Sequence, residues 1–384
     1  MRHAAVFAGT PAFFDMHPAH SSVSASQDAY IRATDFDRPT MVFDLDMLRE
    51  KYRALDAGLG TASIHYAVKA NPAPEVVRAL GDLGCRFDAA SRGEIDLCLS
   101  HGIPASKIAF GNTIKRAADI AHAHAMGVEQ FSADAEEELH KIAVHAPGAR
   151  VILRMRIEVS DADWPLSFKF GCSQREALRL FALGRGLGLD MAGISFHPGR
   201  QVRDPEMWAP ALDSALSLWE AARAEGANLR ILNIGGGFPA FYGQEMLGTT
   251  EYAARVMGMV RARFGTDVQV MAEPGRGLVA EAGVVVAEVM LVSRKDADDL
   301  ARWVFLDIGK FSGLAETMEE AIRYQFETRH GAEAETGPCI LAGPSCDSAD
   351  VLYEKRPLQL PLDLACGDKI RILCTGAYTT SYSS

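Results

Sequence analysis

Residues able to take part in chemistry follow short apolar runs throughout the middle of the sequence. An amine, carboxylates, an imidazole, guanidinium groups and a run of glycines all occupy such places. Together they offer a nucleophile, proton donors and acceptors, and a backbone that an anion can approach closely. These residues are Lys69, Asp88, Arg154, His197, Gly235, Gly236, Gly237, Glu273 and Arg276.

Lys69 ends the run IHYAVK, where a strand is expected to meet a loop. A lysine there loses hydration, which is costly unless the amine is paired or used chemically. Desolvation lowers the pKa of an amine and makes it a nucleophile, so we expect Lys69 to be a buried, functional lysine. The ordinary alternative is a surface lysine whose stem is covered.

The triple glycine and Arg276 suit a phosphate group, because backbone N–H groups and a guanidinium can both bind one. The glycines could equally serve a tight turn. His197 alone could be a hydrogen-bonded core residue. Glu273 could simply pair with Arg276, and Cys346 could be an inert buried thiol.

The elements that must position these residues form an alternating pattern. Strand-like runs cover residues 64–69, 86–90, 108–112, 130–134, 150–156, 192–197, 230–235 and 268–273. Amphipathic helical segments between them cover residues 73–84, 92–102, 115–127, 135–146, 208–226 and 252–265. Eight such units predict an α/β fold with a TIM-like (βα)8 barrel, whose catalytic residues lie at the carboxyl ends of the strands. A doubly wound open sheet is the competing prediction.

The flanking segments differ from the barrel. Residues 40–45 resemble a strand, and after residue 280 short strands alternate with turns. We therefore predict an N-terminal segment over 1–45 whose strand joins the β domain, a barrel over 46–280, and an antiparallel β-barrel or sandwich domain over 281–384. Within the last we expect a helix at 313–326 and a polar loop at 327–338.

Composition limits the class of protein. Apolar residues make up 48% and charged residues 23%, and the net charge is −11. These values are typical of a globular protein and favour neither nucleic acid nor a membrane as partner. The N-terminus lacks the apolar core of a secretory leader. Seven cysteines without a C-x-x-C pair predict a cytoplasmic location and no zinc site.

A phosphate site, an activated lysine, a carboxylate and an imidazole together suggest pyridoxal 5′-phosphate. An acid such as Glu273 would keep the pyridine nitrogen protonated and the ring a strong electron sink. This favours decarboxylation over racemisation.

The motifs YAVKAN, FDAASRGE, GNTIK, KFG, SFHPGRQ, NIGGGFP, EPGRGLVA, GPSCDSADVL and GAYT occur in this order. Together they resemble the ornithine/diaminopimelate/arginine decarboxylase family of pyridoxal-phosphate enzymes, whose fold is like that of alanine racemase. The resemblance extends from about residue 38 onward. CDSAD resembles the bacterial ornithine decarboxylase branch, whereas diaminopimelate enzymes typically have CES.

The resemblance implies roles for individual residues. Lys69 would carry the cofactor, His197 would stack on its ring and Glu273 would bond its nitrogen. Cys346 would protonate the substrate carbon, and Asp347 would bind the distal ammonium group. Both come from the partner subunit in this family, which implies a head-to-tail homodimer with shared active sites. The remaining cofactor-binding residues would be Asp88, Arg154, Gly235, Gly236, Gly237, Gly275, Arg276 and Tyr378; Glu320 and Tyr378 would face the substrate.

Two departures affect the expected substrate, which is L-ornithine converted to putrescine, or L-lysine. Arg200 stands where the family usually has serine; it could contact the phosphate or favour a larger substrate with a distal carboxylate. Relatives also continue beyond SYSS into a segment containing FNGF, so we expect one wall of the pocket to be missing. A non-enzymatic alternative is an inactive regulatory homologue, although such relatives tend to lose Lys69 or the Cys346–Asp347 pair.

Overall fold

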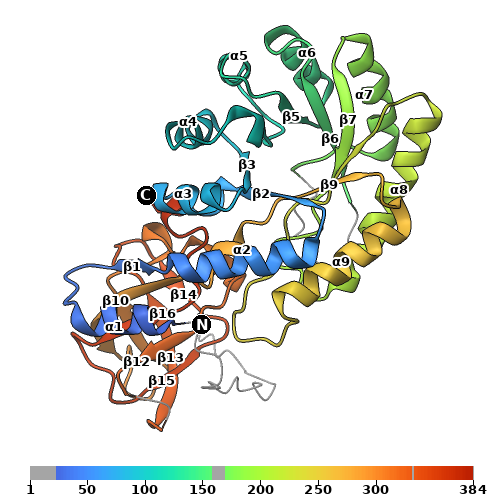
Figure 1. Cartoon of the computed structure of the whole chain (residues 1–384). Coiled ribbons are helices and arrows are strands. Elements are labelled where there is room, and N and C mark those ends of the chain that lie inside the picture. Colours follow the sequence, from blue (N-terminus) through green and yellow to red (C-terminus); the bar gives the residue numbers. More distant parts are fainter. Residues whose placement is uncertain (1–22, 158–168, 331–332, 384) are drawn as a thin grey trace, which may run out of the picture.

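The computed structural model describes residues 23–157, 169–330 and 333–383. In these ranges the chain forms a closed barrel and a second sheet, which lie beside each other (Figure 1). The N-terminal residues 1–22, for which the sequence predicts no secretory leader, lie outside the described ranges. Among the described helices, none has the length and apolar character needed to cross a bilayer.

Eight parallel strands close the barrel in chain order, so the predicted TIM-like fold is confirmed and the open sheet is excluded. Each predicted run overlaps one strand. A layer of Ile152, Ala192, Ile231 and Met271 forms its own buried cluster, as expected for a barrel filled by side chains. The strands are β2 (Ser63–Ala67), β3 (Arg86–Ala89), β4 (Ile108–Phe110), β5 (Gln130–Ala133), β6 (Arg150–Arg154), β7 (Asp190–Ser195), β8 (Ile231–Asn233) and β9 (Gln269–Ala272).

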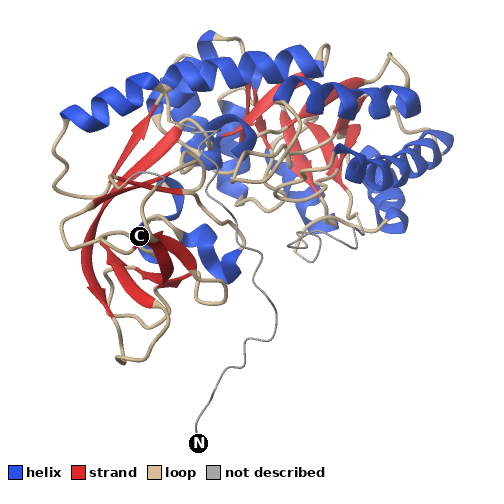
Figure 2. Cartoon of the chain, turned by 90° about the horizontal axis from the view of Figure 1, so that it is seen from below, coloured by secondary structure: helices blue, strands red, loops and turns tan. Residues whose placement is uncertain are grey.

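Helices cover the outside of the barrel (Figure 2). Their apolar faces pack on the strands, and glycines end several of them; α9, for example, ends at Gly265 with φ of 72°, a conformation that favours glycine. The helices are α2 (Leu45–Leu59), α3 (Pro74–Asp82), α4 (Arg92–Ser100), α5 (Ala117–Ala125), α6 (Glu136–His145), α7 (Gln174–Gly186), α8 (Ala209–Ala224), α9 (Thr249–Phe264) and the short α10 (Arg276–Val279).

The second sheet combines β1, which precedes the barrel in the sequence, with strands that follow the barrel. The predicted N-terminal strand, β1, pairs antiparallel with β10, and helix α1 (Ala25–Ala33) precedes it. The sheet is mostly antiparallel, but β11 and β13 run parallel because the chain between them crosses to pair β12 with β16. Its strands are β1 (Thr40–Phe43), β10 (Gly283–Ser293), β11 (Arg302–Leu306), β12 (Phe326–Thr328), β13 (Thr336–Ala342), β14 (Val351–Leu352), β15 (Leu358–Pro361) and β16 (Lys369–Ile372).

The helix predicted at residues 313–326 is wrong. The segment instead forms the 3-10 turn η7 (Ala315–Glu320), which is broken by non-helical angles at Met318 and Glu319. Glu316 pairs with the buried Arg276, and the buried Glu320 pairs with the exposed Arg356, which is distant in the sequence. This tertiary pairing overrides the helical pattern. The predicted loop at 327–338 is also shorter than expected, because β12 includes residues 327 and 328 and β13 begins at Thr336.

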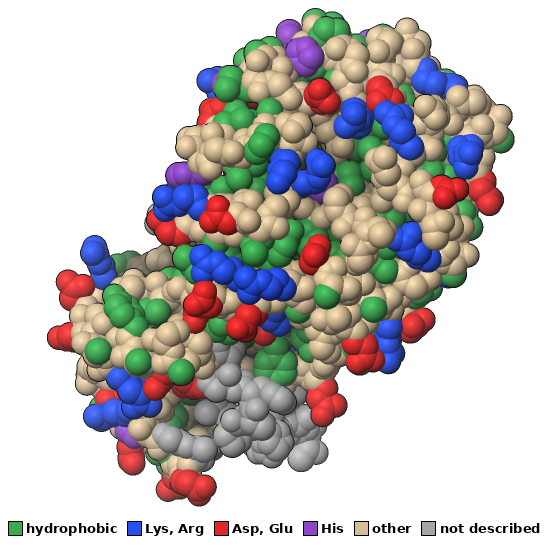
Figure 3. Space-filling model, viewed as in Figure 1, with side chains coloured by type: hydrophobic (Ala, Val, Ile, Leu, Met, Phe, Trp, Pro, Cys, Tyr) green, Lys and Arg blue, Asp and Glu red, His purple; other side chains and the backbone are tan. Residues whose placement is uncertain are grey.

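Backbone contacts join the segment after β16 to the first barrel strand. The Tyr378 N–H donates to the Ala70 carbonyl at 2.7 Å. The Asn71 side-chain amide donates to the Gly376 carbonyl at 2.9 Å. The end of the chain is thereby fixed next to the residues that follow β2. Acidic and basic side chains are interspersed on the face seen in Figure 3, with no large field of one sign.

Candidate active site

Lys69 and Asp88 lie together at the carboxyl end of the barrel. Lys69 is in the 3-10 turn η2 (Val68–Ala70) after β2, and Asp88 lies opposite Ala67 on β3. The Lys69 Nζ is 3.5 Å from Asp88 Oδ2; the lysine side chain is 49% exposed and the aspartate side chain 4%. The expectation of a buried amine is therefore wrong: the amine reaches solvent, although its partner is buried.

The predicted lowering of the Lys69 pKa is also wrong. Loss of hydration by the amine acts to lower this pKa, but electrostatic interactions with Asp88 first, and then with Tyr378 and Glu273, outweigh it and raise the pKa above its usual value. A carboxylate at 3.5 Å favours the charged amine. Desolvation alone would lower the pKa of Lys69, but the ion pair with Asp88 and the other nearby groups, which the sequence does not reveal, together have the larger effect.

Gly111, which follows β4, makes room for the carboxylate of Asp88. A Cβ atom at Gly111 would lie 1.7 Å from Asp88 Oδ1, so any other residue would displace the carboxylate. Asp88 Oδ1 is buried and has no hydrogen-bond partner among the described residues. Gly111 was not among the predicted site residues, because the predicted strand at 108–112 included it, whereas β4 ends at Phe110.

Glu273, after β9, is held by a residue that the sequence analysis missed. The Asn233 side-chain amide at the end of β8 donates to Glu273 Oε1 at 2.5 Å. The Oδ1 atom of Asn233 accepts the Gly235 N–H at 2.8 Å. Burial first, and then the Asp88 carboxylate, raise the pKa of Glu273 to about 7. Glu273 thus bonds Asn233 rather than forming the simple pair with Arg276.

His197 follows β7 and is neutral near pH 7. Burial, with the positive charges of Arg154 and Lys69, lowers the pKa of His197 to about 3. Its Nδ1 accepts the Gly199 N–H at 3.2 Å, so the neutral ring carries its proton on Nε2. A neutral imidazole can lie against an aromatic ring without placing a second cation beside Lys69.

The three glycines after β8 are required by close packing. Gly235 and Gly237 have φ of 71° and 95°. A Cβ at Gly236 would lie 2.8 Å from the Glu273 carbonyl oxygen and 3.1 Å from His197 Nε2. The glycine loop therefore lies between the loops that carry Glu273 and His197. Close packing explains why these residues are glycines, and their backbone remains next to the site.

Arg276 makes a buried ion pair that the sequence did not predict. Its Nη2 donates to Glu316 Oε1 at 2.8 Å and its Nη1 to the Tyr242 hydroxyl at 3.0 Å. Both charged side chains are 4% exposed. The guanidinium carbon lies 5.0 Å from the centre of the Tyr378 ring. Arg276 Nε is buried and has no hydrogen-bond partner within the described ranges.

Three further candidates surround this cluster. Arg154 lies at the end of β6, with its guanidinium 4.9 Å from the Phe170 ring centre. Gly275 approaches Tyr378, because a Cβ there would be 3.2 Å from the tyrosine hydroxyl. Arg200 is exposed, and its charge contributes to the lowered pKa of His197.

The structure does not bring the other candidates into this cluster. Cys346 and Asp347 are exposed in the loop after β13. Asp347 bonds only within that loop, to the Ala349 N–H and through its own N–H to Ser345. The Glu320 carboxylate accepts from Arg323 and from the Lys355 and Arg356 backbone. These contacts lie within its own domain, and a role of Glu320 towards the substrate stays a prediction.

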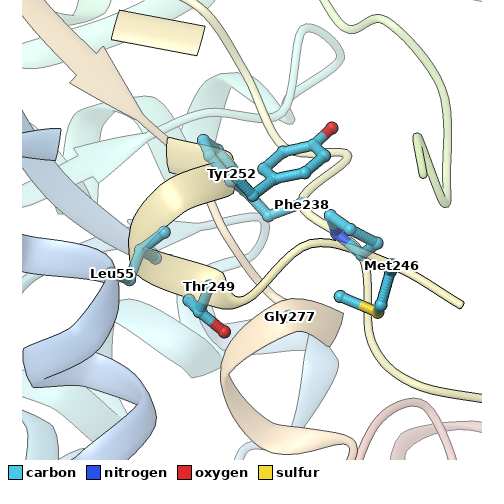
Figure 4. A pocket seen from close by; sticks show the side chains of 7 residues that line it. Leu55, Phe238, Met246, Thr249, Tyr252 and Gly277 are labelled. Carbon is cyan, nitrogen blue, oxygen red and sulfur yellow. The ribbon is translucent and has the colours of Figure 1, made fainter. Parts of the chain in front are cut away.

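A separate apolar pocket lies where α2, α9 and α10 meet (Figure 4). None of the candidate residues lines it; its lining residues are Leu55, Phe238, Pro239, Met246, Thr249, Tyr252 and Gly277.

A lysine beside buried acids at the mouth of a parallel barrel, with a glycine loop and an arginine nearby, defines a barrel-type pyridoxal-phosphate enzyme. The model of the pyridoxal-dependent decarboxylases, for their pyridoxal binding domain, matches residues 45–280. The chain belongs to this family, and its cofactor is pyridoxal phosphate.

Relatives with known names support the same assignment. Lysine/ornithine decarboxylase from Selenomonas ruminantium is 32% identical over 345 residues, which are 89% of this chain and 85% of that protein. Antizyme inhibitor 2 from Xenopus laevis is 31% identical over 363 residues, 88% of this chain and 76% of that protein. The crystal structure of lysine/ornithine decarboxylase complexed with cadaverine from Vibrio vulnificus superposes with a TM-score of 0.84 at 33% identity, covering 94% of this chain and 96% of the other.

The residues at the barrel mouth fit this cofactor. Asp88 Oδ1 and Arg276 Nε are buried polar atoms without partners among the described residues. Such atoms are costly unless a ligand or water satisfies them. Glu273 supplies an acid for a ring nitrogen, and Lys69 supplies the amine that reacts with an aldehyde.

Proposed function

We propose that this decarboxylase of basic amino acids acts on L-ornithine and forms putrescine, the step that supplies polyamine biosynthesis. The observation that carries the proposal is the acid Glu273, held by Asn233 at the same barrel mouth as Lys69. An acid next to the ring nitrogen suits a strong electron sink, and the relatives from Selenomonas ruminantium and Vibrio vulnificus are named lysine/ornithine decarboxylases.

The bound cofactor would supply the electron sink that accepts the bonding pair when carbon dioxide leaves. Lys69 would bind it covalently through Nζ, and Glu273 would hold a proton at its ring nitrogen. His197 would stack on the ring as a neutral imidazole. Phosphate binding would fall to Gly235, Gly236, Gly237, Gly275, Arg276, Tyr378 and Arg200, with Asp88 and Arg154 lining the pocket.

Cys346 and Asp347 would act on the substrate from the partner subunit. Cys346 Sγ would return a proton to the substrate α-carbon, and Asp347 would pair with the distal ammonium group. Their exposure, and the lack of bonds from either to the described barrel residues, support a shared site in a homodimer. Mixing Lys69→Ala with Cys346→Ala protein should then restore about a quarter of wild-type activity, because half of the randomly formed dimers hold one complete site. Failure of the mixture to gain activity would argue against sharing.

Release of carbon dioxide from carboxyl-labelled L-ornithine tests the proposed activity. We expect release by the wild type and by Lys51→Ala, whose lysine pairs with Glu281 away from the site. Lys69→Ala should release none and should not retain the cofactor after borohydride reduction. Absence of release from ornithine, lysine and other basic amino acids would refute the proposal.

Two alternatives have specific support. Arg200 would suit a larger amino acid with a distal carboxylate, and then Arg200→Ser should shift preference towards ornithine. An inactive regulator is supported only by the similarity to antizyme inhibitor 2. A substrate panel on the wild type separates these from lysine or ornithine decarboxylation.

Two further properties are part of the proposal. The division into segments 1–45, 46–280 and 281–384 is supported by the match over residues 45–280. A cytoplasmic location is supported by the seven cysteines, none of which forms a disulfide bond among the described residues.

A further inference from the structure

Asp350 is a buried aspartate that joins two loops at the same edge of the second sheet. It is 3% exposed. One loop, Gly309–Ser312, follows β11, and the other, Gly343–Asp350, follows β13. Because β11 and β13 are parallel neighbours, the two loops leave the sheet at the same end.

The carboxylate of Asp350 accepts hydrogen bonds from both loops. Oδ1 accepts the Lys310 N–H at 2.7 Å. Oδ2 accepts the Ser345 hydroxyl at 2.8 Å and the Ser345 N–H at 3.3 Å. Three donors to one buried carboxylate fix its orientation.

Glycines surround this carboxylate closely. A Cβ atom at Gly309 would lie 2.2 Å from Asp350 Oδ1, and one at Gly343 would lie 2.2 Å from Oδ2. The backbone closes the loop as well, since Gly343 N–H donates to the Asp350 carbonyl at 2.9 Å and Asp350 N–H to the Asp347 carbonyl at 3.1 Å. The carboxylate thus occupies the space that two other side chains would fill.

Cys346 and Asp347 lie inside this closed loop, between Ser345 and Asp350. We infer that Asp350 is a positioning residue, which holds Cys346 and Asp347 in the conformation in which they act on the substrate. The inference rests on the proposed roles of those two residues. It adds that their geometry depends on a third, buried acid that does not itself touch the substrate.

Asp350→Asn tests the inference with little change of shape. An amide can accept from one loop only, so its NH2 group would face the donors of the other. Amide hydrogen exchange should become roughly tenfold faster or more at whichever of Lys310 and Ser345 loses its acceptor, as expected for the loss of a hydrogen bond to a charged group. With ornithine, kcat should fall and KM should rise, whereas the absorption spectrum of the cofactor bound at Lys69 should not change.

Asp368→Asn is the matched control. Asp368 is also a buried acid of this domain, 6% exposed, and its Oδ2 accepts the Ala365 N–H at 2.9 Å in a different turn. This variant should speed exchange at Ala365 but leave Lys310 exchange and both kinetic constants unchanged.

The outcomes separate this inference from the proposed function. If Cys346→Ala and Asp347→Ala both retain full activity, the proposed roles fail, and the exchange result still decides whether Asp350 orders the loop. If those variants lose activity but Asp350→Asn keeps wild-type kcat and KM, or leaves exchange unchanged, the inference is overturned. Should Asp350→Asn fail to fold, Ser345→Ala removes the hydroxyl donor alone and is judged by the same exchange and kinetic measurements.

Discussion

Burial and the Asp88 carboxylate raise the pKa of Glu273, whereas the hydrogen bond from the Asn233 amide lowers it, so removal of that amide gives the sharpest test of the site. Asn233 is 1% exposed and donates to Glu273 Oε1 at 2.5 Å. A hydrogen bond to a charged group contributes about 1.5–3 kcal/mol. Since one pKa unit corresponds to about 1.4 kcal/mol, Asn233→Leu should raise the pKa of Glu273 by roughly 1–2 units above its present value of about 7.

The titration can be followed directly in the cofactor-free protein by carbon NMR of carboxyl-labelled glutamate. The Glu273 signal is assigned by its loss in Glu273→Gln. In the holoenzyme, the acidic limb of the kcat/KM profile should move to higher pH in Asn233→Leu, because a protonated acid cannot pair with a protonated ring nitrogen.

Gln130→Leu serves as the control. Its amide lies beside Met271 Sδ at 3.4 Å, away from Glu273, so the titration should stay at its wild-type midpoint. An unchanged Glu273 midpoint in Asn233→Leu, or an equal shift in Gln130→Leu, would refute the reasoning.

Three further predictions concern stability and the site. Gly111→Ala should displace Asp88, because Asp88 Oδ1 would be 1.7 Å from the new Cβ. The pKa of Lys69 should then fall, which reductive methylation at varied pH measures. Burial, and then nearby Arg86, lower the pKa of His65 to about 3. Below pH 6.5 the unfolded chain therefore binds more protons, and the free energy of unfolding should fall by about 1.4 kcal/mol per pH unit down to the folded pKa. Urea unfolding of His65→Phe should show a shallower fall, and an equal slope would contradict the assignment. Glu316→Ala leaves a buried guanidinium unpaired and should cost about 3–5 kcal/mol in urea unfolding; a loss below 1 kcal/mol would contradict the ion pair.

The sequence by itself determined the barrel and the places of its chemical groups. Alternation of apolar strands and amphipathic helices is a local pattern, and eight parallel strands can close in essentially one way. Residues at strand ends then meet at one rim, which is why Lys69, Asp88, His197 and Glu273 could be named together. The order of the motifs along the chain was enough to indicate the family.

Only the tertiary structure decided how these groups are paired and charged. Asn233 and Gly111 are ordinary loop residues in the sequence, and their roles depend on atoms from neighbouring strands. The Lys69 amine is strongly basic because the fold brings the carboxylate of Asp88, a residue on the next strand of the barrel, to 3.5 Å from it.

The same reason explains the errors in the second domain. The helical pattern at 313–326 was overridden by ion pairs of the two buried carboxylates Glu316 and Glu320, which pair with Arg276 and Arg356, residues that are distant in the sequence. Charge pairing, close approach of glycine and the protonation of buried acids all depend on distances between distant residues, and a one-dimensional pattern carries no such distances.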